Sequence, residues 1–123
     1  MDLSESMEMY LETIFLIEKE HGHAHVVDIA KRLEITKPSV TKAMKQLKDE
    51  GFITRESYGH ITLTDKGEII SKKIIYKHDL ISNFLEKSLN LTSSEASENA
   101  CRMEHIITDA MITAIESYFK NES

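Results

Sequence analysis

Residues 26–51 read VVDIAKRLEITKPSVTKAMKQLKDEG and contain two amphipathic segments separated by a tight turn. Apolar residues recur at helical spacing over 27–33 and again over 37–50, which predicts two helices. Thr36 is a favourable N-cap for the second helix, and Pro38 stands in its first turn, where a missing N–H costs nothing. The final glycine of the stretch ends that helix. These residues therefore predict a helix-turn-helix.

A small hairpin is expected directly afterwards. Residues 52–56 (FITRE) and 60–64 (HITLT) resemble strands, with apolar residues alternating in the second, and Ser57, Tyr58 and Gly59 form the turn between them. A helix-turn-helix followed by a hairpin predicts a winged helix-turn-helix.

The rest of the sequence is expected to be helical. Residues 4–21 have apolar side chains at three- and four-residue spacing, and residues 65–89 form a long helix capped by Thr64. Two more helices are predicted in the tail. A capping box over 92–95 opens the first, and Thr108 or Asp109 opens the second.

The predicted fold class is thus mainly α, with two units. Residues 1–66 form a winged helix-turn-helix DNA-binding domain, and residues 67–123 form an all-helical domain. The second domain is small and amphipathic, so its helices need a partner surface, most simply the same region of a second subunit. A homodimer through the C-terminal helices is expected.

Composition restricts the functional classes. The chain has 123 residues, a net charge of -6 and a single cysteine, Cys101, so no intrachain disulfide can form. No apolar run approaches the roughly 20 residues that span a bilayer, and no signal peptide is apparent at the start. A cytoplasmic protein without membrane contact is expected.

Basic charge gathers on the predicted second helix of the helix-turn-helix. Residues 37–48 hold four lysines and no acid, whereas residues 86–123 are predominantly acidic. This helix should enter the major groove of DNA, although a lysine-rich face that is merely solvated is the alternative. The residues predicted to contact DNA here are Thr36, Lys37, Pro38, Ser39, Thr41, Lys42 and Lys45. Arg55 and the hairpin turn around Tyr58, Gly59 and His60 would lie along the DNA backbone or minor groove.

A candidate metal motif stands in the tail, where Cys101, Glu104 and His105 have the spacing of one helix face. Sulfur, oxygen and nitrogen donors together favour iron(II), cobalt(II), nickel(II) or zinc(II) over calcium or magnesium. The alternative is a buried cysteine beside a solvated Glu–His pair. Histidines outside this motif need no ligand role, and His21, His23 and His25 are expected in a solvated loop.

Several motifs together resemble the diphtheria toxin repressor / manganese transport regulator family of metal-dependent repressors. They are MYLETI (9–14), AKRL (30–33), TKPSVT (36–41), LTDKG (63–67), KHDL (77–80) and ACRMEH (100–105). The resemblance covers nearly the whole chain, in the family's order. It implies a dimeric repressor that binds operator DNA when loaded with divalent metal and controls metal-uptake genes, in the family's two-domain form without an SH3-like domain.

The resemblance also implies a ligand set. Met9, Cys101, Glu104 and His105 match the activating site of the iron-responsive branch, whereas the manganese-responsive branch has carboxylates at the first two positions. Because manganese(II) prefers oxygen ligands, the two sulfur atoms favour iron(II) as the cofactor. Manganese(II), cobalt(II), nickel(II) and zinc(II) stay as alternatives. Glu12 matches a carboxylate of the manganese branch.

Other positions depart from the family pattern. His78 matches a ligand of an ancillary metal site, but Ser82 and Ser97 stand where two of its partners are expected. Lys42 stands where some members carry a base-contacting glutamine, so the operator sequence is expected to differ.

The resemblance suggests a mechanism. Met9 belongs to the first unit and Cys101, Glu104 and His105 to the second, so a shared metal would fix the angle between the units. In a dimer that angle sets the separation of the recognition helices, which must equal about one DNA turn or a multiple.

Three rival functions remain at this stage. A manganese(II)-responsive repressor of the same family is the nearest. A winged-helix regulator could instead bind a small organic ligand in an apolar pocket lined by Ile74, Ile75, Phe84 and Leu85. An enzyme using the Cys101 thiol is disfavoured, because neither a glycine-rich loop nor a nucleophile elbow accompanies it.

Overall fold

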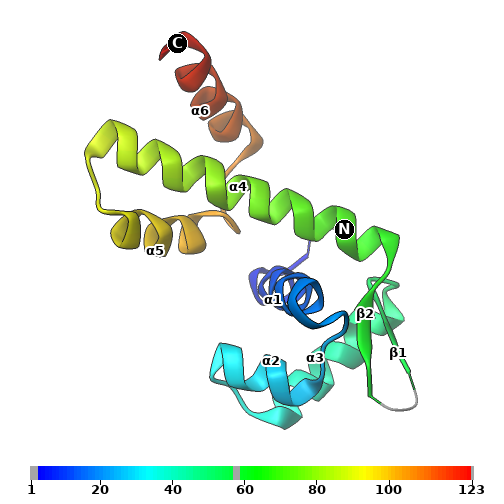
Figure 1. The fold of residues 1–123 in the computed structure, drawn as a ribbon. Helices are drawn as coiled ribbons and strands as arrows, with labels where there is room; N and C mark the ends of the chain where they lie inside the picture. Colours follow the sequence, from blue (N-terminus) through cyan, green and yellow to red (C-terminus); the bar gives the residue numbers. More distant parts are fainter. Residues whose placement is uncertain (1–2, 57–58, 123) are drawn as a thin grey trace. The chain divides into compact units, whose positions relative to one another are not determined.

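The computed structural model describes residues 3–56 and 59–122. Within these ranges the chain has six helices and a two-stranded antiparallel sheet (Figure 1). The elements are α1 (Glu5–His21), α2 (Val26–Leu33), α3 (Lys37–Asp49), β1 (Ile53–Arg55), β2 (Ile61–Leu63), α4 (Asp65–Leu89), α5 (Ser93–Met103) and α6 (Asp109–Glu122). None of the described helices is both long and apolar enough to cross a membrane.

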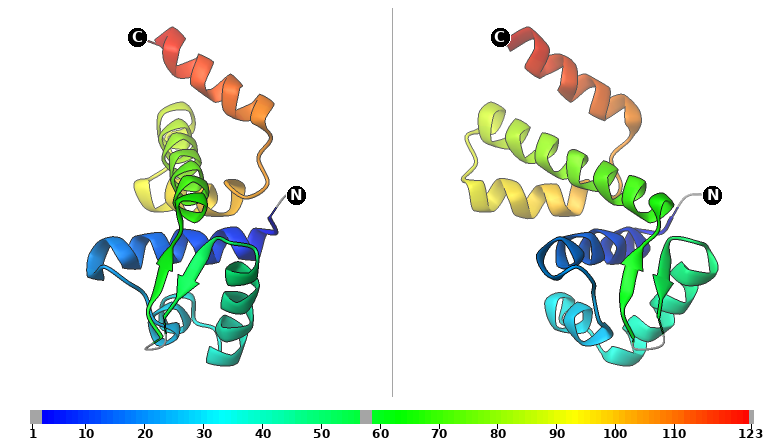
Figure 2. Two further views of the ribbon diagram at one scale, coloured as in Figure 1. Left: turned by 90° about the vertical axis from the view of Figure 1, so that its right-hand side faces the viewer. Right: turned by 45° about the vertical axis from the view of Figure 1, so that its right-hand side comes forward.

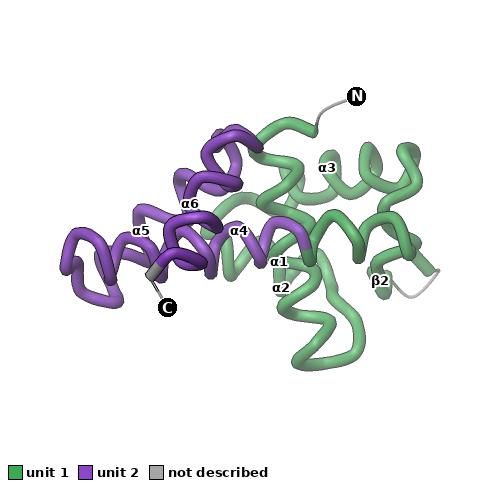
Figure 3. The backbone as a smooth tube through the Cα atoms, turned by 90° about the horizontal axis from the view of Figure 1, so that it is seen from above, with its two compact units in different colours: residues 1–72 green, residues 73–123 purple. Residues whose placement is uncertain are grey.

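The chain divides into two compact units, Met1–Lys72 and Lys73–Ser123, which Figure 3 draws in green and purple. The division falls inside α4, so the first two turns of this helix belong to the first unit. The domain boundary at residues 66 and 67 stays a prediction.

The first unit is a helix-turn-helix with a hairpin. Glu34 lies in the left-handed region with φ of 56° and ends α2, and the Thr36 hydroxyl accepts a hydrogen bond from the Ser39 N–H at 3.4 Å to cap α3. Strands β1 and β2 lie side by side in both views of Figure 2, with Thr54 opposite Thr62. The fully buried side chains of this unit's core are Leu11, Ile14, Ala24, Ile29, Val40, Met44, Leu47 and Ile61.

The start of α4 is tied tightly to the first unit. A Cβ added at Gly67 would lie 2.1 Å from the Phe52 carbonyl oxygen, so only glycine fits at this position. One turn later, the buried Ser71 hydroxyl donates to the Leu11 carbonyl at 3.1 Å. Thr64 caps the helix, as predicted, by accepting a hydrogen bond from the Gly67 N–H at 3.2 Å.

The segment between α1 and α2 corrects one expectation. His21 is exposed, but His23 and His25 are half-buried and do not lie in a solvated loop. Ala24, which stands between them, pairs with Ile61 through two backbone hydrogen bonds of 2.8 and 2.9 Å. This long-range pairing is an isolated antiparallel bridge that joins the segment before α2 to strand β2.

The second unit consists of the remainder of α4 with α5 and α6. Its core joins all three helices, with Ile81 and Leu85 from α4, Ala96 and Ala100 from α5, and Ile112 and Ile115 from α6. The capping box that opens α5 is present, since the Glu95 N–H donates to the Thr92 hydroxyl and the Thr92 N–H donates to the Glu95 carboxylate. These bonds lower the pKa of the Glu95 carboxyl.

The predicted fold class, a mainly α chain with a winged helix-turn-helix followed by a helical region, is confirmed. The predicted hairpin turn includes Ser57 and Tyr58, which lie outside the described residues.

Candidate metal centre and nucleic-acid interface

The expected DNA-contacting residues occupy one exposed surface at the start of α3. The helix buries the opposite face, with Val40, Ala43, Met44 and Leu47 in the core. All of the residues predicted there are exposed: Thr36, Lys37, Pro38, Ser39, Thr41, Lys42 and Lys45. Arg55 on β1 is half-buried, and Tyr58 lies outside the described residues. An exposed basic face at a helix N-terminus fits phosphate and base-edge contacts.

The candidate metal centre of the second unit is built around a buried carboxylate. Glu104 is fully buried, and its Oε1 lies 3.3 Å from Nε2 of His105, whose side chain is only 2% exposed. Its other oxygen, Oε2, lies 2.9 Å from Nδ1 of His78 on α4. One carboxylate and two imidazoles therefore meet at one place in this unit.

The backbone explains how Glu104 and His105 come together. Helix α5 ends at Met103, before both residues, which corrects the expectation of one helix running through His105. Glu104 keeps helical φ and ψ angles, and its N–H donates to the Ala100 carbonyl at 2.9 Å. The helical spacing therefore persists for one residue beyond the helix, and a turn then positions the imidazole of His105.

The other predicted ligands lie in different surroundings. Cys101 is exposed on α5, one turn before the buried Glu104. Met9 and Glu12 lie on α1 and are both half-buried. Their roles as ligands stay predictions.

His78 lies between Glu104 and Ser97, and its role as a ligand of an ancillary site stays a prediction. Its Nδ1 faces Glu104, and its Nε2 lies 3.3 Å from the Ser97 hydroxyl. The serine that replaces an expected ligand thus forms a hydrogen bond to the histidine. Twenty-six residues separate His78 from Glu104, so helical spacing gave no signal of their contact.

The donor set fits a divalent transition metal. A carboxylate and imidazole nitrogens are common ligands of manganese(II), iron(II) and zinc(II). Within the part of the chain that the structure describes, Glu104 Oε1 is buried and accepts no hydrogen bond. A buried carboxylate oxygen in this state is costly, and a bound cation would satisfy it.

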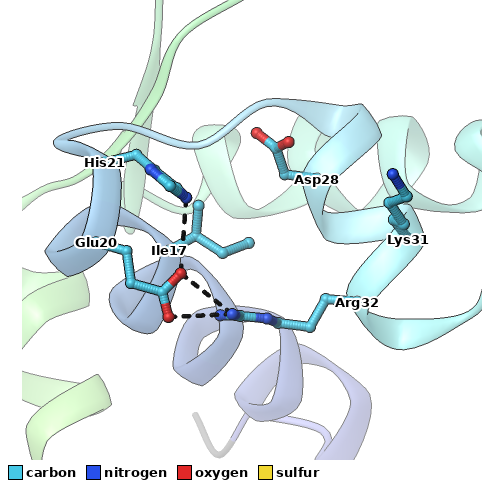
Figure 4. Close-up of a pocket in the computed structure, with 6 residues that line it drawn as sticks. All are labelled: Ile17, Glu20, His21, Asp28, Lys31 and Arg32. Carbon is cyan, nitrogen blue, oxygen red and sulfur yellow. Dashed lines mark hydrogen bonds and ion pairs between the residues drawn. The ribbon is translucent and has the colours of Figure 1, made fainter.

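The hollow between α1 and α2 has a different character (Figure 4). It measures about 250 Å³ and is lined by Ile17, Glu20, His21, Asp28, Lys31 and Arg32. Arg32 donates to both carboxylate oxygens of Glu20, at 3.1 and 3.2 Å. These charged walls do not resemble an apolar ligand pocket. Of the residues expected to line such a pocket, Leu85 and Phe84 pack into the core of the second unit instead.

The fold and the two sites define a class: a winged-helix transcriptional regulator with a helical metal-binding unit. Comparisons with known proteins agree. The family model "Iron dependent repressor, N-terminal DNA binding domain" matches residues 2–61. The model "Iron dependent repressor, metal binding and dimerisation domain" matches residues 64–122.

Individual relatives give the same assignment. The uncharacterized HTH-type transcriptional regulator MJ0568 of Methanocaldococcus jannaschii is 38% identical over 119 residues, which are 96% of this chain and 95% of that protein. The HTH-type transcriptional regulator MntR of Shouchella clausii is 36% identical over 103 residues, 84% of this chain and 71% of that protein. The solved structure of the manganese regulator SloR superposes with a TM-score of 0.80 at 27% identity, over 98% of this chain and 55% of SloR. The chain thus spans about half the length of that solved protein.

This chain belongs to the iron-dependent repressor family, the diphtheria toxin repressor / manganese transport regulator family that its motifs resemble. The family consists of transcriptional regulators, so the expectation that the chain is not an enzyme is confirmed.

Proposed function

We propose that this protein represses transcription from operator DNA when Glu104 and His105 hold a divalent metal, with manganese(II) as the activating ion. The observation that carries the proposal is the buried Glu104 carboxylate beside two imidazoles. It lies in the unit whose family model is described as metal binding and dimerisation. The same unit would form a homodimer through its helices, as that description implies.

The choice of metal rests on the donors that lie together. They are an oxygen atom of Glu104 and a nitrogen atom of His105, and manganese(II) favours oxygen-containing ligand sets. SloR, a relative in fold and sequence, is described as a manganese regulator. Iron(II) is the second candidate, favoured by the sulfur atoms at Met9 and Cys101. The exposure of Cys101 supports manganese(II) over iron(II).

Each residue has a distinct part in this proposal. Glu104 and His105 bind the metal directly, and the family resemblance adds Glu12 as a further ligand of manganese(II) and Met9 and Cys101 as further ligands of iron(II). His78 holds the Glu104 carboxylate in one orientation through its hydrogen bond. When bound, the metal supplies positive charge and directional coordination bonds. Its binding would favour the DNA-competent state of the protein, and DNA would raise metal affinity by the same factor.

DNA recognition is assigned to the exposed start of α3. Lys42 and Lys45 would contact phosphates or guanine acceptors, and Thr36 and Thr41 would contact base edges or thymine methyl groups. Arg55 would contact the DNA backbone beside the hairpin. Binding to phosphates releases counterions, so affinity should fall steeply with salt.

The test is fluorescence anisotropy of anaerobic protein on labelled DNA from upstream of its own gene. Chelator, manganese(II) and iron(II) are compared at matched free concentrations. Wild type is expected to bind tightly only with metal, and Glu104→Gln is expected to lose at least about tenfold of the metal stimulation. Glu68→Gln, which alters a surface carboxylate paired with Lys72, is the matched control and should behave as wild type.

The outcomes separate the candidates. Metal-independent binding by wild type would contradict the proposed function. Activation by iron(II) at the lower free concentration, together with loss of activation in Cys101→Ser, would replace manganese(II) by iron(II) as the activating ion.

A further inference from the structure

Three histidines of the first unit lie together, and none of them belongs to the candidate metal centre of the second unit. His23 and His25 come from the segment between α1 and α2, and His60 immediately precedes β2. Their side chains are half-buried. One ring nitrogen from each residue lies within 4.8 Å of the other two.

Backbone pairing explains why the three side chains share a face. Ala24 and Ile61 are hydrogen-bonded to each other in both directions, and both side chains are fully buried in the core. Side chains alternate between the two faces of an extended segment, so the neighbours of a core-facing residue point to the opposite face. His23, His25 and His60 are all immediate neighbours of this buried pair.

The ring contacts agree with the register. The rings of His23 and His60 are stacked with centroids 3.9 Å apart and planes 12° from parallel. The ring of His25 meets both edge-on, at 5.0 Å from His23 and 4.9 Å from His60. The backbone thus brings three imidazoles together from two segments that are distant in sequence.

We propose that this trio, the histidine cluster of His23, His25 and His60, is a zinc(II) site. Imidazole nitrogens suit zinc(II), and three of them with one open position form a recurrent zinc geometry. Zn–N bonds of about 2.0–2.1 Å in a tetrahedron place the nitrogens roughly 3.3 Å apart. Rotation of the rings about their side-chain bonds would bring the nitrogens from the observed spacing to this distance, while the Ala24–Ile61 hydrogen bonds hold the backbone.

A carboxylate stands at the right register position to complete the coordination. The Glu56 N–H donates to the His60 carbonyl at 2.9 Å, so these two residues face each other across the hairpin. Residues directly opposite each other in an antiparallel ladder share a face, which places Glu56 on the side of the histidine cluster. Glu56 or a water molecule would supply the fourth ligand.

Zinc(II) at this position would cross-link the segment before α2 to the hairpin of the DNA-binding unit. The three-nitrogen donor set differs from the carboxylate-containing set at Glu104. The two sites should therefore prefer different metals: zinc(II) at the histidine cluster and manganese(II) at Glu104. The protein would thus respond to zinc(II) through its DNA-binding unit, independently of the activating ion.

The test is calorimetric titration of the untagged full-length protein with zinc(II), together with cobalt(II) absorption spectra. Wild type is expected to bind one equivalent more than His60→Gln or His23→Gln. The d–d absorption of cobalt(II) at a three-nitrogen site should disappear in both variants. His21→Gln is the matched control, because its side chain is 67% exposed and lies outside the cluster. Glu104→Gln should keep the equivalent bound by the histidine cluster.

Equal zinc(II) binding by the cluster variants and by wild type would overturn the proposal. If both cluster variants, shown to be folded by circular dichroism, bind as many equivalents as wild type and His21→Gln, the three rings are only a packing contact.

Discussion

Replacing His78 tests whether the Glu104 carboxylate is held in place for a metal. The imidazole Nδ1 lies 2.9 Å from Glu104 Oε2, a distance typical of a strong hydrogen bond to a carboxylate. The His78 side chain is 24% exposed and that of Glu104 is fully buried, so few water molecules can take over this contact. His78→Ala should therefore leave Glu104 poorly oriented and lower the affinity for manganese(II).

The size of the effect follows from this geometry. Removing a residue that orients a metal ligand costs about 10–100-fold in metal affinity. That range equals about 1.4–2.7 kcal/mol of binding free energy. Burial of Glu104 favours the upper part of the range, and a loss beyond it would indicate that His78 also binds the metal. His78→Gln separates the two roles, because its side-chain amide can donate to Glu104 and should restore much of the affinity if His78 only positions the carboxylate.

The assay is calorimetric titration with manganese(II) of wild type, His78→Ala, His78→Gln and the exposed-histidine control His21→Ala. Circular dichroism establishes that each variant is folded. A manganese(II) affinity of His78→Ala within about threefold of wild type would show that His78 does not position the carboxylate for a metal, since the expected loss is at least about tenfold.

Three further predictions concern the fold and the DNA surface. Gly67→Ala should lower the free energy of unfolding by about 1–3 kcal/mol, because the new methyl group would clash with the Phe52 carbonyl oxygen. A thermal melt measures this change, and an unchanged melting temperature would contradict the close approach. Thr92→Ala should cost about 1 kcal/mol of stability in urea unfolding by removing the cap of α5, and Thr92→Ser should recover most of it. Lys42→Ala and Lys45→Ala should each weaken metal-dependent DNA binding. Loss of one phosphate contact should also reduce the steepness of log affinity against log salt by about 1, and an unchanged slope in both variants would show that neither lysine contacts a phosphate.

Helix caps and turns, which depend on residues close together in the sequence, could be predicted from the sequence. Helix caps were predicted at Thr36, Thr64 and Thr92, and each hydroxyl accepts the expected backbone hydrogen bond. These caps act over three residues, so residue type and spacing are sufficient to predict them. The tight turn between α2 and α3 was predicted for the same reason.

Contacts between residues far apart in the sequence could not be predicted from it. The sequence gives no sign that Ala24 pairs with Ile61, so the expectation of a solvated loop at His23 and His25 was wrong. The contact between His78 and Glu104 joins two helices and also had no local signal. The end of α5 at Met103 was missed because neither glycine nor proline marks it.

The candidate metal centre was therefore predicted in part. The spacing of Glu104 and His105 indicated a carboxylate and an imidazole acting together, and the two side chains do lie within 3.3 Å. Helical spacing also suggested that Cys101 shares their face, yet it is exposed whereas Glu104 is buried. Helical periodicity predicts which residues share a face, but it does not predict which neighbouring elements cover each turn of that face. The burial of Cys101 and Glu104 therefore differs although they are one turn apart.

Coupling of metal binding and DNA binding through the second unit is tested by measuring the manganese(II) affinity without DNA and with saturating operator DNA. Thermodynamic linkage requires DNA to raise metal affinity by the factor by which metal raises DNA affinity, about 5–150-fold for typical coupling free energies. We expect matching factors in wild type and loss of the coupling in Glu104→Gln. Equal manganese(II) affinity in both states of wild type would contradict this coupling.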